Sequence, residues 1–154
     1  ALPEYLEPLI RLAGALDNEK SDQSTIKLVF DALGKLGGIA VEPLAELLEK
    51  YEKKGQLYET LIVTLASTAS EHKSERVYRL LKDCFRKSES KLVESLALAK
   101  YGDGRAVSAI RGHVEKNMDS ITEHDFSRFE SAVMDLGGDM SDLAMHLFGH
   151  YAMD

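Results

Sequence analysis

The sequence has a single cysteine, Cys84, and no tryptophan. One cysteine cannot form an intramolecular disulfide, and no paired spacing of cysteine and histidine indicates structural zinc. This cysteine usage fits a reducing compartment best, and we expect a cytoplasmic protein. Only three prolines occur, and charged residues are interspersed with apolar ones instead of gathering in tails, which argues against a disordered chain.

Long apolar runs are also missing. No segment approaches the ~20 uninterrupted apolar residues of a membrane span, and the first residues lack the basic segment and apolar core of a signal peptide. We therefore expect no insertion into a membrane. The sequence begins with Ala1 instead of methionine, so we expect a processed or excised product.

The length of 154 residues predicts one domain, spanning 1–154, with a core of its own. The net charge of −7 disfavours non-specific binding of nucleic acid. This charge is unevenly distributed: it is −4 over residues 1–70, +4 over residues 71–118 and −7 over residues 119–154. A basic middle is flanked by two acidic ends.

Apolar residues recur with the 3.6-residue period of an α-helix, and no segment alternates with the two-residue period of a strand. The sequence therefore predicts an all-α fold. The clearest case is residues 74–88, where Val77, Leu81 and Phe85 share one face and Ser74 is a suitable N-cap. About nine helices are expected, at residues 2–16, 22–36, 40–54, 57–69, 74–87, 89–101, 105–118, 122–137 and 141–152.

Glycine pairs and a capping motif mark the helix ends. Gly37-Gly38, Gly102-Asp103-Gly104 and Gly137-Gly138 follow apolar stripes, where glycine accepts the left-handed conformation that ends a helix. The segment from Thr122 to Asp125 is typical of a capping box. The short connections between helices predict that successive helices lie antiparallel.

Corner residues recur along the chain. Six-residue segments that begin at Ala32, Thr64, Ala97 and Ala132 match one another at spacings of 32, 33 and 35 residues. Such a recurrence is typical of stacked helical hairpins. It predicts a leading helix at 2–16 and four hairpins, near 22–54, 57–87, 89–118 and 122–152, whose small corner residues allow close helix approach.

The stretch ALGKLGGIAVEPLAELL, from Ala32 to Leu48, resembles the HEAT repeat family, in particular the bacterial HEAT-like repeats first associated with phycobilin lyases. The stretch YGDGRAVSAI, from Tyr101 to Ile110, is similar to the same corner. The second repeat departs from the pattern at Ala69-Ser70 and the fourth at Met140-Ser141-Asp142-Leu143, so we assign no subfamily. The resemblance implies a right-handed α-α superhelix, a HEAT/armadillo-like solenoid, whose second helices line a concave surface that binds a protein partner.

The strongest candidate binding surface is the basic face of residues 74–88. Its cations recur at three- and four-residue steps on the second helix of a hairpin, which predicts a concave location, and a cation of the next second helix extends the stripe. An acidic peptide is the expected ligand. The competing interpretation is that these side chains only solvate the helix. The predicted partner-binding residues are Arg76, Arg79, Lys82, Arg86 and Arg111.

Other polar groups support no site. Asp142, His146 and His150 share one helical face, but a metal would need a fourth ligand that the sequence does not offer nearby. Cys84 falls within an apolar stripe, which predicts burial and not nucleophilic use. We therefore expect neither a metal nor a cofactor.

The last helix carries apolar side chains on more than one face, whereas a terminal repeat normally needs a polar outer face. Further chain or a partner covers them, or they form an exposed end; self-association through this helix is one expectation. The side chains concerned are Met140, Met145, Phe148, Tyr151 and Met153.

The resemblance and the lack of catalytic motifs predict a non-catalytic protein-interaction module, not an enzyme. The alternative is a HEAT-like enzyme or enzyme subunit, either a chromophore lyase component or a DNA glycosylase. A glycosylase would need a basic groove with aromatic stacking platforms, and the negative charge and missing tryptophan disfavour it.

Overall fold

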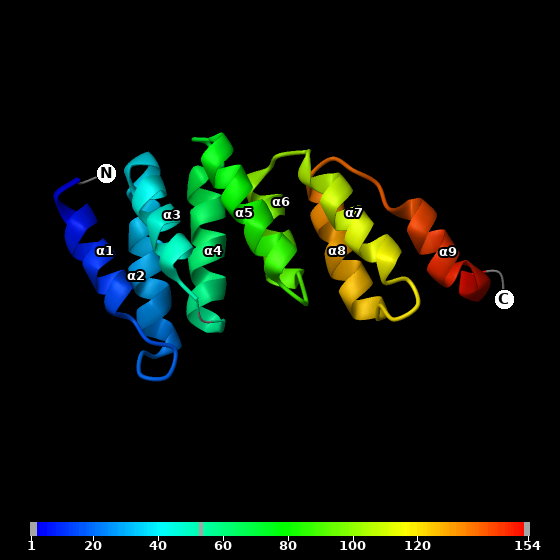
Figure 1. Ribbon diagram of the computed structural model, residues 1–154, viewed down its shortest axis with the longest axis horizontal. Helices are drawn as coiled ribbons and strands as arrows, with labels where there is room; N and C mark the ends of the chain where they lie inside the picture. Colours follow the sequence, from blue (N-terminus) through cyan, green and yellow to red (C-terminus); the bar gives the residue numbers. More distant parts are fainter. Residues whose placement is uncertain (1–2, 53, 153–154) are drawn as a thin grey trace.

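A computed structural model describes residues 3–52 and 54–152, with side chains as far as Gly149. Over these residues the chain forms nine α-helices and no strand (Figure 1), which confirms the predicted all-α class. The helices are α1 (Leu6–Ala15), α2 (Gln23–Lys35), α3 (Val41–Lys50), α4 (Gln56–Ala69), α5 (Glu75–Lys87), α6 (Leu92–Tyr101), α7 (Ala106–Lys116), α8 (Glu123–Asp135) and α9 (Ser141–Ala152). Two short 3-10 helices, Pro3–Tyr5 and Gly37–Ala40, precede α1 and α3.

The observed α-helix ends differ most from the predicted ones at α1, which begins at Leu6 after a short 3-10 helix, at α3 and at α6. Helix α3 ends at Lys50 and not at residue 54, because Tyr51 takes an extended conformation. Helix α6 begins at Leu92 and not at residue 89, because Lys91 before it is left-handed, with φ of 61°. The predicted helix start at residue 2 and residue 53 lie outside the described part of the chain.

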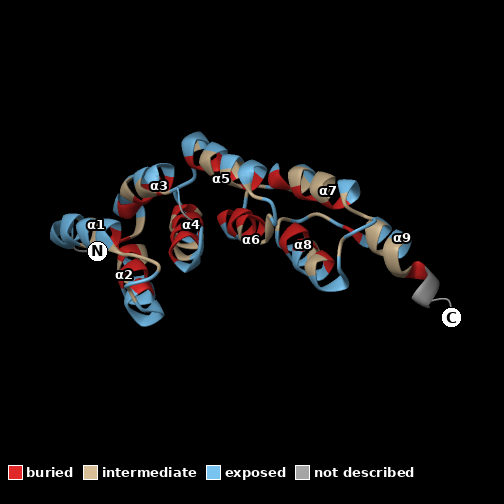
Figure 2. Ribbon diagram, turned by 60° about the horizontal axis from the view of Figure 1, so that its bottom comes forward, coloured by how far each residue is buried: buried red, intermediate tan, exposed pale blue. Residues whose placement is uncertain are grey.

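The helices form two layers. Figure 2 shows α2, α4, α6 and α8 in one row and α3, α5 and α7 in a second row that covers it. The even-numbered helices pack extensively on one another, and α1, α3, α5 and α7 each pack mainly on the even-numbered helix that follows. We call the even-numbered row the inner layer and the odd-numbered row the outer layer.

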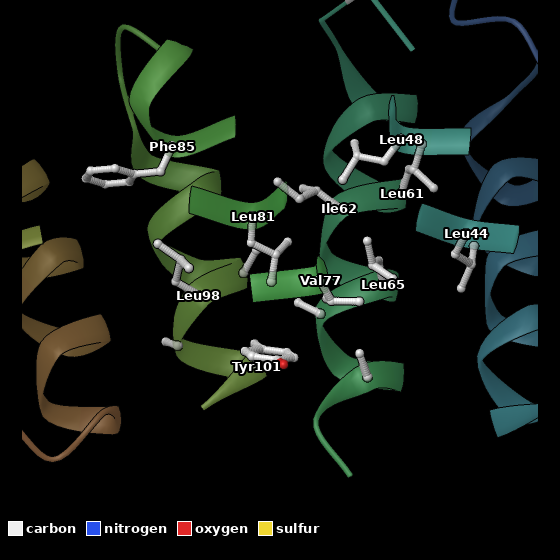
Figure 3. Close-up of a cluster of buried hydrophobic side chains, with 14 of the residues drawn as sticks. Leu44, Leu48, Leu61, Ile62, Leu65, Val77, Leu81, Phe85, Leu98 and Tyr101 are labelled. Atoms are coloured by element: carbon white, nitrogen blue, oxygen red, sulfur yellow. The ribbon is translucent and has the colours of Figure 1, made fainter. Parts of the chain in front are cut away.

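The core lies between these layers (Figure 3). Leu44 of α3 and Leu81 of α5 are fully buried, as are Leu65 of α4 and Leu98 of α6. Each of these side chains comes from the apolar stripe of its helix, so no helix buries its stripe without a neighbour. Burial of one such leucine stabilises the fold by roughly 1.5–3 kcal/mol.

The rows are curved, and the inner layer lies on the inside of the curve (Figure 2). The expectation that the helix at residues 74–88 lines a concave surface is therefore wrong, since α5 belongs to the outer layer. The physical reason is the close lateral packing of the inner helices on one another. The row whose helices lie closest together is the shorter one, so the array bends toward it and that row lies on the concave side.

The predicted helix-end signals are confirmed. Ser74 Oγ accepts a hydrogen bond from the Val77 amide at 3.2 Å, and Thr122 Oγ1 accepts one from the Asp125 amide at 3.1 Å. Gly37, Gly102 and Gly137 have φ of 71°, 90° and 86°. In this left-handed region a residue with a Cβ is strained, so these glycines let the chain leave each helix.

The last helix, α9, is less exposed than expected at its start. Met140 is fully buried, which corrects its expected exposure, and the Phe148 ring lies edge-on to Phe126 with centroids 5.4 Å apart. Met145 is exposed over 64% of its surface. Tyr151 and Met153 fall outside the described side chains. None of the helices in the described residues combines the length and apolar character that crossing a bilayer requires.

Replacing Gly138 with alanine should destabilise the fold by about 1–3 kcal/mol. A Cβ at Gly138 would lie 2.8 Å from Cγ1 of both Val107 and Val133, and these β-branched side chains have few rotamers in which to move aside. Urea unfolding measures the effect. Gly104→Ala is the control, since a Cβ there meets only ordinary contact, 3.8 Å from the Leu136 carbonyl oxygen; equal stability of the two variants would contradict the explanation.

Candidate functional site

Helix α5 forms one wall of the candidate site. Its buried residues Val77, Leu81 and Phe85 face the core, so the intervening charged residues necessarily point away from the core. The Ser74 cap fixes where the helix begins and thus which residues face outward.

A groove of about 790 Å³ lies in the outer layer between α5 and α7. Figure 2 places these two helices in the same row with α6 beneath them. A volume of this size falls within the range of pockets that bind small molecules or single peptide segments. The groove is therefore large enough to admit several side chains of a partner.

Among the described residues, five cations and one acid line this groove. Asp83 is the acid, and its Oδ1 accepts a hydrogen bond from Arg86 at 2.9 Å. Arg79 lies 3.7 Å from Glu75, and both side chains are exposed, so this ion pair contributes little. The groove thus carries net positive charge in a chain whose net charge is −7. The lining cations are Arg79, Lys82, Arg86, Lys91 and Lys116.

The apolar part of the lining comes from both helices. Phe85 and His113 meet edge to face, with ring centroids 6.3 Å apart. Ala109 and Gly112 leave the opposing face of α7 nearly flat beside them. Tyr78 lies under Lys82, whose Nζ is 5.8 Å from the ring centroid, close enough for a cation–π contact.

Arg76, which was predicted as part of the site, lies outside the groove. Its guanidinium donates to Glu42 and Glu49, both on α3. This arginine therefore joins two neighbouring outer helices, and its charge is already compensated within the fold.

Arg111 also lies outside the groove, although it was expected to extend the basic stripe. Its guanidinium donates to Asp142 Oδ1 at 2.9 Å and Oδ2 at 2.7 Å, and to the Asp139 carbonyl oxygen at 2.6 Å. This bidentate pair lowers the pKa of the Asp142 carboxyl to about 2 and raises the pKa of Arg111. Arg111 therefore ties α7 to the first turn of α9, and Asp142 is engaged by an arginine.

Lys91, Lys116 and His113 belong to the site, and the sequence analysis missed them. Lys116 lies one turn after Gly112 on α7, so the spacing of small residues and a lysine could have indicated it. Lys91 has no such signal. Its Nζ donates to three carbonyl oxygens at the end of α5, those of Phe85, Arg86 and Ser88, at 2.7–3.1 Å.

His113 is half-buried between the two layers. Its ring lies edge-on to Phe129 of α8 at 5.1 Å, and Asn117 Nδ2 lies 3.3 Å from its Nδ1. Desolvation lowers the pKa of His113, and the nearby cations Lys91 and Lys116 lower it further. The imidazole is therefore neutral at pH 7, and the positive charge of the groove comes from lysine and arginine.

A second polar cluster is enclosed among α4, α5 and α6. Tyr58 donates to Glu94 Oε2 at 2.6 Å, and Lys54 Nζ lies 3.8 Å from the same oxygen. Glu94 is 1% exposed, and its Oε1 has no hydrogen-bonding partner within the described residues. Burial raises the pKa of the neighbouring Cys84 thiol, which keeps it protonated and poorly nucleophilic. Tyr58 and Glu94 are buried in the core and Cys84 packs against it. The Lys54 side chain is 59% exposed and reaches this cluster from the surface.

Comparison with protein families, with curated proteins and with solved structures finds no match to this chain.

Replacing Arg111 with alanine should loosen α9 while leaving α5 in place. The substitution removes a bidentate ion pair and a bond to the Asp139 carbonyl, which are the polar ties between α7 and the start of α9. Hydrogen exchange should become at least severalfold faster in α9 and stay unchanged in α5. Arg79→Ala is the control, because Arg79 makes no tie between helices in the described residues. Unchanged exchange in α9 would show that Arg111 does not hold it.

Acidification should destabilise the native chain partly through His113. Since its folded pKa lies below the unfolded value of about 6.5, this group's stabilising contribution is complete above pH ~6.5 and is lost as the pH falls from there toward the folded pKa. Urea unfolding across this pH range measures the free energy of unfolding. This free energy should depend less on pH for His113→Gln than for the native chain. His124→Gln, at an exposed position on α8, should keep the native pH dependence. Equal slopes for all three proteins would refute the role of His113.

Proposed function

We propose that this chain is a non-catalytic protein-binding module that takes an acidic segment of a partner into the groove between α5 and α7. The observation that carries the proposal is the concentration of five cations and one acid around an open volume of about 790 Å³. Cations that outnumber the acids around a groove attract an anionic ligand and speed its encounter. An acidic peptide meets this requirement.

The chain's overall charge supports a protein ligand over a nucleic acid. With −7 in total, and −4 and −7 on the segments that flank the basic middle, the molecule as a whole repels a polyanion that extends beyond the groove. A short acidic segment contacts only the groove and avoids this repulsion. The acidic flanks thereby limit the length of the ligand.

The wider architecture in this proposal is a HEAT-like solenoid with a right-handed superhelix. The two-layer array of antiparallel helices and the recurring corner residues support it. The repeat unit that fits the packing best is an outer helix followed by an inner helix, as in α3–α4 and α5–α6. The unpaired Cys84 supports placement in the reducing cytoplasm.

Reversing the charge of Arg79, Lys82 and Lys116 to glutamate should weaken binding of a fluorescent peptide rich in Glu and Asp by on the order of 100-fold or more. Arg79 and Lys116 are exposed and Lys82 is half-buried, and all three line the groove, so the fold should tolerate the change. Fluorescence anisotropy at two salt concentrations measures affinity, and native affinity should fall as salt rises.

The matched control reverses Lys35, Lys100 and Arg128, three exposed cations of the inner layer, and thus makes the same change in net charge. Native-like affinity is expected for it. Equal loss in both triple variants would mean that net charge and not the groove governs binding. Binding and turnover of a bilin, or excision of a damaged base, by the native chain would support the enzyme alternatives instead.

A further inference from the structure

Gly112 lies in the interior of α7 without a structural need for glycine. A Cβ at this position would meet nothing within 4 Å, and its φ is not in the left-handed region. Glycine in a helix interior costs roughly 0.5–1 kcal/mol relative to alanine. At Gly138, by contrast, close packing accounts for the residue. Gly112 thus lowers the stability of α7, and the packing of the helix against its neighbours does not explain why a glycine is there.

The space above Gly112 opens into the groove. Ala109, one turn earlier, adds a second small side chain. Phe85 of α5, which is 6% exposed, contributes its remaining accessible surface to the same lining. His113 completes the set by meeting Phe85 edge to face. We call these four residues, Phe85, Ala109, Gly112 and His113, the socket. Its lining is apolar or aromatic, and cations surround it.

A carboxylate alone does not match the socket, because its lining offers no cation. An apolar side chain does, since burial against Phe85 and the α7 backbone removes apolar surface from water. Aromatic rings also favour edge-to-face contact with a further ring. Anchors of this kind, inserted at the centre of a polar contact region, supply much of the binding energy in protein interfaces.

We propose that the socket receives one bulky apolar side chain, aromatic or long aliphatic, from the acidic partner segment, whose flanking carboxylates pair with Arg79, Lys82 and Lys116. This inference rests on the proposed function and specifies its ligand: acidic residues on both sides of a single apolar anchor. The charges supply attraction and orientation, and the anchor supplies discrimination among acidic segments.

Two synthetic peptides test the socket on the native chain. Both have Glu and Asp on either side of a central residue, which is Phe in one and Ala in the other. Fluorescence anisotropy should show the Phe peptide binding on the order of 10- to 100-fold more tightly, which corresponds to burial of one large apolar side chain. A single-stranded oligouridylate serves as a third probe and should bind weakly.

Gly112→Leu should abolish the preference for Phe by filling the socket, so that the Phe and Ala peptides bind this variant with equal affinity. Ala109→Leu fills the same space from a position one turn earlier on α7. It replaces Gly112→Leu in this test if that variant does not fold. Ser127→Leu adds the same side chain at an exposed position of α8 and should keep the native preference. Gly112→Ala should raise the thermal stability, because no neighbour opposes the added methyl group.

The outcomes separate the two proposals. Equal binding of the Phe and Ala peptides by the native chain overturns the socket and leaves the acidic-ligand function standing. Absence of binding by both peptides overturns both proposals, and tight binding of the oligouridylate in their place identifies the groove as a nucleic-acid site. A Phe preference that persists in both socket-filling variants places the anchor elsewhere.

Discussion

Side-by-side packing of the inner helices is the constraint on which the remaining structure depends. Helices α2, α4, α6 and α8 pack closely on one another, and the fully buried residues of α4 and α6 include small ones such as Ala66 and Ala97. Each outer helix then packs its apolar stripe onto this row. Since the inner helices set the shorter arc, the outer helices stand further apart, and the groove between α5 and α7 follows from that spacing.

Five basic residues of the middle segment fall into two groups. Arg76 and Arg111 form ion pairs with acids of neighbouring helices and hold outer helices in register. Arg79, Lys82 and Lys116 lie at the groove. The two interpretations of the basic face, solvation of the helix and binding of a ligand, therefore concern the second group.

Helix positions could be predicted from the sequence because apolar periodicity, caps and left-handed glycines are local signals. Ser74, Thr122 and Gly102 each act within one turn of their own position.

The layer to which α5 belongs could not be predicted in this way, because periodicity shows which face of a helix is buried but not how far apart neighbouring helices lie. The pairing of Arg111 with Asp142 spans 31 residues, and nothing local marks it. Glu94 was missed because α6 is buried nearly all round, so the apolar pattern leaves no polar face against which a buried carboxylate stands out.

In a curved array of two helix layers, the curvature and the distance between neighbouring outer helices change together. Stronger bending of the rows would move α5 and α7 further apart, and straightening would bring them together. The reason is that the closely packed inner helices cannot be compressed much further, so a change of curvature changes mainly the spacing of the outer helices. Lys91 ties the end of α5 to the start of α6, so we expect these two helices to move as a unit. A ligand bound between α5 and α7 would therefore favour one curvature of the whole array. Tension applied to the two ends of the array would straighten it, narrow the groove and weaken binding of that ligand.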